Sequence, residues 1–362
     1  MKKVLLGTTA LVAAGMVASA PAMAAEKLSA QVGGYMEQWI GFTTVDDGST
    51  RDVDGIDIKS DSEIHFKGST TLDNGITFGI NVQLEANSNA ADQIDESYLI
   101  VRGGFGEINL GSENSALYKM HYAPSDFGIG INSGDQVDWA LGGSAQISSG
   151  GYFRAPGGST YIEPARANDS EKITYYTPRF SGFQVGASYS PDTLQDSNGL
   201  TDRSNTAGNL TDGVMFGANF KGEFSGASVG VSAGYGTFLE NGTSSSTSDE
   251  PEAYAFGATL GVGGFGAGAS WAHAENQTSG NGDAYNLGVS YSTGPFGVSL
   301  TYFHGENEGT YEQDTVHLSG KYALGPGVTA AATLGNAQFE SASSTIADVE
   351  ATYFVTGIRL SF

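Results

Sequence analysis

The stretch ATYFVTGIRLSF, from Ala351 to Phe362, is the clearest structural signal in the chain. Its residues alternate strictly between two faces, which is the two-residue repeat of a β-strand. One face carries Thr352, Phe354, Thr356, Ile358, Leu360 and Phe362, and the other carries Ala351, Tyr353, Val355, Gly357, Arg359 and Ser361. The same alternation recurs upstream, for example over residues 63–67, 76–85 and 183–189. The sequence therefore predicts an all-β protein, although alternation alone also fits a soluble sandwich.

The lengths of the connections separate these two architectures. Short turns alternate with long polar segments along the chain. There are seven short turns and eight long segments, and these fifteen connections join sixteen strands. The tight turns lie near residues 72–75, 103–106, 180–182, 222–226, 263–264, 293–295 and 325–327, and the long segments near 45–60, 88–94, 114–170, 192–212, 240–252, 275–283, 305–313 and 340–348. This pattern predicts a 16-stranded antiparallel transmembrane β-barrel with short periplasmic turns and long extracellular loops.

Phenylalanines gather beside the short turns, as expected for an aromatic girdle at one membrane interface. They are Phe105, Phe180, Phe183, Phe224, Phe265 and Phe296.

The third long segment, residues 114–170, spans about 57 residues and is rich in tyrosine, phenylalanine and tryptophan. Loops of this length in compact proteins are usually functional or disordered, and so many aromatic residues argue against a solvated linker. We therefore expect this third loop to fold inward against the barrel wall.

Composition limits the location and partners of the protein. Lys2 and Lys3, an apolar stretch and the small residues around Ala24 predict a signal peptide over residues 1–24, with the barrel over 25–362, although a retained N-terminal anchor is an alternative. There is no cysteine, which excludes disulfides and thiolate metal sites. The 40 acidic residues against 16 Lys and Arg argue against nucleic acid as a partner and predict attraction of cations.

Several stretches resemble the Gram-negative outer-membrane porin family, in particular its alphaproteobacterial general-diffusion type. The resemblance is carried by residues 63–75, by residues 95–111 and 172–183 around the third loop, and by the terminal strand that ends at Phe362. It implies a homotrimer with one pore per subunit, a third loop that narrows the channel, and a C-terminal assembly signal at Phe362. It also implies export to the cell outer membrane, where lipid and lipopolysaccharide are the surrounding partners.

The family pattern places acidic residues of the third loop opposite basic residues of the channel wall. The loop candidates are Glu113, Asp126, Asp135, Asp138 and Glu163, and strand parity adds the pore-wall candidates Glu37, Glu63, His65, Lys67, Glu85, Arg102, Lys172, Lys321 and Arg359. As a set they are expected to create a transverse field with a weak preference for cations.

Motifs for chemistry are weak in this chain. Residues 261–266 fit G-x-G-x-x-G and residues 226–234 contain two overlapping G-x-S-x-G patterns, but both lie in continuous strand patterns rather than at strand-to-helix turns. The five histidines do not show zinc-ligand spacing. We therefore predict no catalytic residue, cofactor or metal ligand, and leave open calcium bound by Asp/Asn-rich loops such as that at Asp46 and Asp47.

The sequence predicts a non-enzymatic channel for passive diffusion of ions and small hydrophilic solutes. The closest alternative is an outer-membrane channel specific for a sugar or an amino acid. A barrel enzyme and a secreted all-β adhesin are further alternatives.

Overall fold

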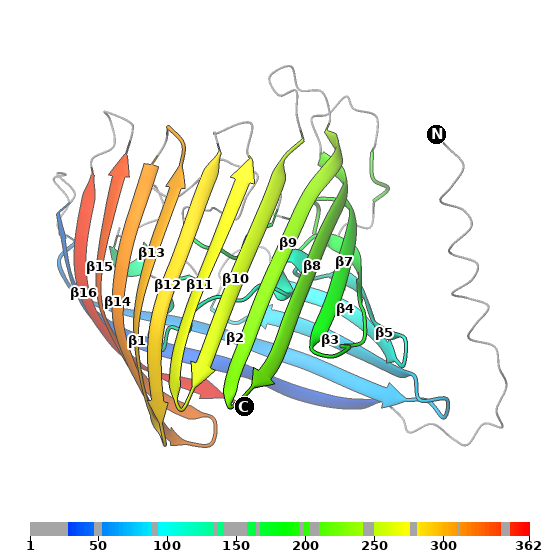
Figure 1. Ribbon diagram of the computed structural model, residues 1–362, viewed down its shortest axis with the longest axis horizontal. Coiled ribbons are helices and arrows are strands. Elements are labelled where there is room, and N and C mark those ends of the chain that lie inside the picture. The colour runs from blue at the N-terminus through cyan, green and yellow to red at the C-terminus, as the bar shows by residue number, and fades with distance from the viewer. Residues whose placement is uncertain are drawn as a thin grey trace.

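Sixteen antiparallel strands form one closed barrel in the computed structural model, with β1 beside β16 and every other strand beside its sequence neighbours (Figure 1). The structure describes residues 28–46, 53–87, 93–132, 137–140, 158–163, 167–195, 199–202, 210–241, 250–275, 281–309, 311–341 and 348–362. The strands are β1 (Ser29–Asp46), β2 (Gly55–Thr71), β3 (Thr77–Glu85), β4 (Ile94–Gly103), β5 (Gly106–Ser112), β6 (Glu171–Tyr176), β7 (Phe183–Asp192), β8 (Leu210–Phe224), β9 (Ala227–Asn241), β10 (Glu252–Val262), β11 (Phe265–Glu275), β12 (Gly282–Thr293), β13 (Phe296–Asn307), β14 (Tyr311–Gly325), β15 (Val328–Ser341) and β16 (Val349–Ser361).

Two single-turn helices, α2 (Ala116–Lys119) and α3 (Val137–Ala140), lie in the segment between β5 and β6. In the described part of the chain, no helix is long and apolar enough to cross a membrane.

The predicted count of sixteen strands is confirmed, whereas the lengths of the connections alternate less regularly than expected. Several long connections are shorter than expected, because the strands continue into polar sequence. The connection expected over residues 305–313 shrinks to 308–310, and the one expected over 45–60 shrinks to 47–54. Polar side chains at these strand ends do not disturb the ladder, because the backbone hydrogen bonds of a strand do not depend on side-chain polarity.

The barrel closes where the last strand meets the first. β16 pairs with β1 from Tyr35 opposite Ser361 to Asp46 opposite Glu350. At the short-turn end, the Gly34 N–H donates to the Phe362 carbonyl oxygen at 3.0 Å, and the Phe362 N–H donates back to the Gly34 oxygen at 3.2 Å. The terminal residue therefore belongs to the seam that removes the open sheet edge.

Polarity is reversed relative to a soluble sandwich, because the apolar side chains face outward. On β13, Leu300 is 50% exposed while its neighbours Ser299 and Thr301 are buried inside. All six phenylalanines predicted for the girdle are exposed. An outward apolar face and an inward polar face are the arrangement of a barrel in lipid.

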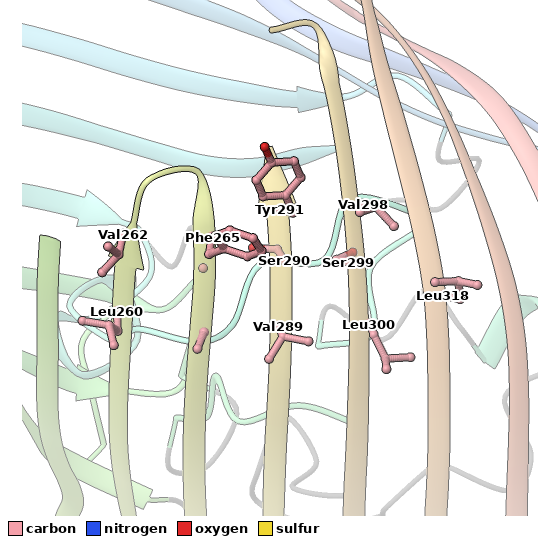
Figure 2. A pocket seen from close by; sticks show the side chains of 12 residues that line it. Leu260, Val262, Phe265, Val289, Ser290, Tyr291, Val298, Ser299, Leu300 and Leu318 are labelled. Atoms are coloured by element: carbon pink, nitrogen blue, oxygen red, sulfur yellow. The ribbon is translucent and has the colours of Figure 1, made fainter. Parts of the chain in front are cut away.

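A shallow apolar depression of about 460 Å³ lies on the outward face of strands β10 to β14 (Figure 2). Its rim includes Leu260, Phe265, Tyr291 and Leu300, and the small side chain of Ala267 lies among them. The depression is on the outside of the wall, so it is part of the lipid-facing surface and not of the channel.

Candidate functional site

The chain that leaves β5 runs along the inner wall of the barrel. Four of its backbone N–H groups donate to hydroxyl groups on β7, β9, β13 and β15, which hold the segment against the wall. The pairs are Ala116 with Ser188 (2.9 Å), Tyr122 with Ser232 (2.8 Å), Phe127 with Ser299 (3.0 Å) and Ile129 with Thr333 (3.0 Å). The predicted inward fold of the third loop is thus observed for its described part.

Glycines of the inner wall allow the loop backbone to approach closely. A Cβ atom at Gly257 would lie 1.8 Å from the Tyr122 carbonyl oxygen, and one at Gly217 would lie 2.2 Å from the Ala116 oxygen. Both contacts are with backbone atoms, which cannot rotate away as a side chain can. The inner face of the wall is therefore shaped to receive the loop.

We expect Gly257→Ala to push the loop toward the lumen and to lower the single-channel conductance. Overpacking of this kind costs about 1–3 kcal/mol, because the clash is with backbone. Gly261→Ala on the same strand and face is the matched control, since its new methyl group would meet only the Ser228 hydroxyl. Equal conductance in both variants would contradict the proposed close contact.

Buried apolar side chains fix the loop at two places inside the barrel. Leu117, Ile131 and Ile162 pack against wall residues such as Met215 and Phe238. At the other place, Trp139 and Ile129 of the loop pack with Trp39, Tyr353 and Val355 of the wall. The hydrophobic core thus lies between the loop and the wall, within the barrel.

Charged groups are buried where the loop begins. Glu113 accepts hydrogen bonds from Lys119 Nζ at 2.6 Å and from Asn109 at 3.1 Å. Burial raises the pKa of Glu113, although Lys119 opposes this effect. Burial would lower the pKa of Lys119, but attraction to Glu113 outweighs it and raises that pKa above its ordinary value.

Two further side chains, Lys172 and Glu163, join Glu113 and Lys119 in a cluster that we call the first anchor of the loop. Lys172 of β6 donates to the backbone oxygens of Glu113, Asn168 (2.9 Å) and Ser170 (2.6 Å). Glu163 accepts from the Ser115 N–H at 2.6 Å. These groups hold both ends of the loop at one place on the wall.

A second anchor joins the loop to the far wall. His317 of β14 is fully buried and bridges Asp126 of the loop, 3.0 Å from its Nδ1, and the Tyr353 hydroxyl, 2.7 Å from its Nε2. Burial opposes ionisation of Asp126, but the hydrogen bond and charge of His317 and the Gly128 N–H together lower the pKa of Asp126. Arg359 of β16 donates to the Gly128 oxygen, and Lys321 Nζ lies 3.8 Å from the centre of the Phe127 ring.

His121 lies between these anchors in the sequence and is buried inside the barrel. Its ring is buried against Tyr161 and bonded to Thr160 Oγ1 at 3.1 Å, and burial lowers the pKa of His121 to about 4. Because the folded loop holds the His121 ring in its neutral form, His121 contributes fully to loop stability at pH values above the ordinary histidine pKa of about 6.5. That contribution decreases as the pH falls toward 4.

We therefore expect loop contacts to weaken by about 3 kcal/mol between pH 6.5 and pH 4. The measurement is the rate of protease cleavage in the loop as a function of pH. His121→Gln keeps a polar group that does not titrate, so this variant should show a smaller acid response. An identical pH profile in both proteins would refute this role of His121.

The wall formed by β1, β2 and β3 is acidic on its inner face. We call Glu37, Asp61, Glu63 and Glu85 the acidic wall, since strand register places Glu37 opposite Asp61 and Glu63 opposite Glu85. Arg359 Nε pairs with Glu37 at 2.8 Å, and His65 Nε2 lies 2.7 Å from Glu63. The Tyr35 hydroxyl donates to Asp61, and Glu85 lies near other carboxylates, among them Glu63. Negative charge therefore remains on this wall.

The structure places the five loop candidates differently from the expected acidic arc. Glu113 and Glu163 are buried anchors, because the loop base covers them, and Asp126 is bound by His317. Asp138 on α3 is exposed and lines a recess of about 530 Å³ with Lys59 and Trp139. Asp135 lies outside the described residues, so its predicted role stays a prediction.

The wall candidates fall into two groups. Seven of them lie at inward-facing positions of their strands, in agreement with their parity: Glu37, Glu63, His65, Lys67, Glu85, Lys321 and Arg359. Arg102 pairs with Glu107 at 2.5 Å in the β4–β5 hairpin, and Lys172 is buried by the loop base. Their roles in selectivity stay predictions.

Several residues inside the barrel were not among the candidates predicted from the sequence. Asp61 and Lys59 share the parity of Glu63; Asp61 directly follows the loop expected over residues 45–60, and Lys59 lies within it. His317 has the parity of Lys321, but its partner Asp126 is 191 residues away in sequence. For calcium, Asp46 ends β1 and Asp47 lies outside the described residues.

Comparison with known proteins agrees with this architecture. The family model for Gram-negative porins matches residues 7–342. An anion-selective porin from Comamonas acidovorans has a TM-score of 0.62 at 16% identity, covering 93% of this chain and 100% of that one. OmpT of Vibrio cholerae, an outer-membrane protein, has a TM-score of 0.57 at 14% identity, covering 94% and 99% of the two chains.

Curated relatives match over shorter stretches. An uncharacterized protein of Rickettsia conorii is 25% identical over 154 residues, which cover 35% of this chain. An uncharacterized protein of Rickettsia bellii is 26% identical over 135 residues. The chain spans about a third of the length of these curated relatives.

The family match extends over most of the sequence, and the structure is a closed sixteen-stranded barrel. We conclude that the chain belongs to the Gram-negative porins and is a β-barrel of the outer membrane.

Proposed function

We propose that the barrel is a water-filled channel that passes ions and small hydrophilic solutes by passive diffusion, with no chemical step. The observation that carries this proposal is the polar inner face of a closed barrel whose outer face is apolar. A polar interior attracts water, which lets hydrated solutes cross without a bound intermediate.

Planar-bilayer recording of the purified, detergent-folded protein tests this proposal. We expect stepwise currents that rise linearly with voltage, and liposome swelling that slows as the uncharged sugar supplied becomes larger. Folded barrels that insert into lipid without conducting would contradict the proposal. Heat-dependent migration on a detergent gel establishes that the barrels are folded.

We further propose a weak preference for cations, which originates mainly in the acidic wall. The loop carboxylates Glu113, Glu163 and Asp126 are engaged in anchors, so they contribute less field than a free acidic arc would. The fold itself sets no sign of selectivity, since the structurally similar protein from Comamonas acidovorans is described as anion-selective. The sign must therefore come from side chains such as Asp61 and Glu85.

A homotrimer in contact with outer-membrane lipid and lipopolysaccharide is part of the same proposal. OmpT of Vibrio cholerae, which shares the fold, has been described in a trimer form. We expect channel closure in three steps per insertion and, after export, an N-terminus near Ala25. Single-step closure would support a monomer instead.

A solute-specific channel is the second candidate function, and one cluster in the loop favours it. Tyr118 and Tyr161 have ring centroids 5.3 Å apart, and Lys119 Nζ lies 4.9 Å from the Tyr98 ring centre. Aromatic faces of this kind can stack on sugars or other planar solutes. Concentration-dependent block of the current by one sugar or amino acid would favour this function over general diffusion.

A further inference from the structure

The outward face of the barrel is strongly acidic at the long-loop ends of β12 to β15. Five carboxylates there point outward, directly beyond apolar residues such as Leu300 and Val316. They are Asp283, Glu306, Glu312, Asp314 and Glu340. The stretch from residue 222 to residue 320 contains no lysine or arginine. This face therefore lacks the basic side chains that usually balance carboxylates.

The strand register brings some of these negative charges side by side. Glu306 lies directly opposite Glu312, and Glu312 lies directly opposite Glu340, so three carboxylates form one row across three strands. Like charges at opposed positions destabilise a sheet. A cation bound beside this row would reduce that repulsion.

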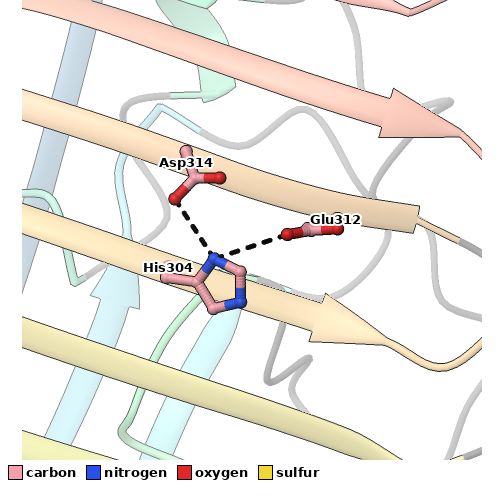
Figure 3. A group of neighbouring side chains, drawn as sticks. All are labelled: His304, Glu312 and Asp314. Carbon is pink, nitrogen blue, oxygen red and sulfur yellow. Dashed lines mark hydrogen bonds and ion pairs between the residues drawn. The ribbon is translucent and has the colours of Figure 1, made fainter.

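One histidine lies beside this row with two carboxylates on the same ring nitrogen. His304 Nδ1 is 3.1 Å from Asp314 Oδ1 and 3.9 Å from Glu312 Oε1 (Figure 3). One ligand atom from each residue lies within 4.8 Å of the others. The Tyr302 hydroxyl donates to Asp314 Oδ1 at 2.5 Å and orients that carboxylate.

These distances are close to those around a small metal ion. Zinc binds imidazole nitrogen and carboxylate oxygen at about 2.0–2.2 Å, so two of its tetrahedral ligands lie about 3.3 Å apart. The Asp314 distance already fits, and the half-exposed Glu312 side chain can move the remaining distance. A mixed nitrogen and oxygen donor set favours zinc-type ions over calcium and magnesium, which prefer oxygen alone.

A second group of the same composition serves as an internal comparison. His273 faces Asp283, 3.1 Å from its Nδ1, and Glu275, 3.9 Å from its Nε2. Here the two carboxylates lie at opposite ring nitrogens. One ion cannot bind a ring nitrogen and both carboxylates in that arrangement, although the residue types are identical.

We propose that His304, Glu312 and Asp314 form a binding site for a zinc-type divalent cation on the outward face of the barrel, at the membrane–water boundary. The site is separate from the channel, because its residues have the opposite strand parity to the buried Gln313, Thr315 and His317. Sequence spacing did not reveal it, since its ligands come from two strands joined by register.

Titration calorimetry with Zn²⁺ on the full detergent-folded protein tests the proposal. We expect one high-affinity ion per chain, affinity at least tenfold weaker in His304→Gln, and unchanged affinity in the matched control His273→Gln. Ca²⁺ at equal concentration should not displace Zn²⁺. Glu312→Gln provides a second variant if His304→Gln fails to fold on a heat-shift gel, and it should also weaken binding.

Three outcomes would overturn the site. They are absence of Zn²⁺ binding by the wild-type protein, unchanged affinity in both His304→Gln and Glu312→Gln, and equal loss of affinity in His304→Gln and His273→Gln. The last outcome would mean that exposed histidines bind the metal without the carboxylate geometry described here.

Discussion

Replacement of His317 by alanine is expected to release the inward loop from the far wall and to make the channel noisy. The variant removes hydrogen bonds to Asp126 and Tyr353 in a fully buried place. Asp126 would remain as a buried carboxylate without its histidine, and breaking a buried pair in this way costs about 3–5 kcal/mol. We expect frequent current fluctuations in single-channel records and faster protease cleavage within the loop.

A graded series makes this prediction specific. Tyr353→Phe removes only the bond to His317 Nε2, which is worth about 1 kcal/mol, so its effect should be small. His273→Ala removes an outward-facing histidine and should behave as wild type. Equal noise in His317→Ala and His273→Ala would show that the far anchor does not hold the loop.

Neutralising two residues of the acidic wall is expected to abolish most of the cation preference. Asp61→Asn with Glu85→Gln preserves size and removes two charges from inward-facing positions. A unit charge about 8 Å from an ion in water is worth about 0.5 kcal/mol, and 0.1 M salt roughly halves this energy. Because cations and anions respond in opposite directions, the two charges together change the ratio by about 1 kcal/mol, so the permeability ratio should fall roughly fivefold.

The matched control removes the same charge from the other face. Glu312→Gln with Asp314→Asn lies outside the channel, so its zero-current potential should equal that of the wild type. Asp138→Asn tests the loop separately. If Asp138→Asn shifted the potential while the double wall variant did not, selectivity would reside in the loop rather than in the acidic wall.

The architecture could be predicted because it repeats. The alternation of side chains shows which residues of a strand share a face, and the turns and loops show where one strand ends and the next begins. Errors of a few residues at the strand ends therefore did not change the predicted number of strands. The strand ends themselves were misplaced at β2 and β13, where polar residues such as Asp57 and Glu306 continue the ladder. Composition cannot reveal this, because a polar strand end and a polar loop look alike.

The arrangement within the channel could not be predicted in the same way. The loop has no period, so the sequence did not show that Glu113 would be covered by its own loop base and by Lys119. The pair of Asp126 and His317 depends on where a 57-residue loop crosses a distant strand. Charge type was therefore visible in the sequence, while burial and pairing required the fold.

The zero-current potential of the wild-type protein in a planar bilayer, under a salt gradient of potassium chloride, shows whether the barrel conducts and which ion it prefers. A water-filled channel with an acidic wall lets potassium cross ahead of chloride, so the dilute side should become positive at an open, stepwise-conducting channel. A dilute side that becomes negative would mean that chloride is the preferred ion and that the acidic wall does not set the selectivity.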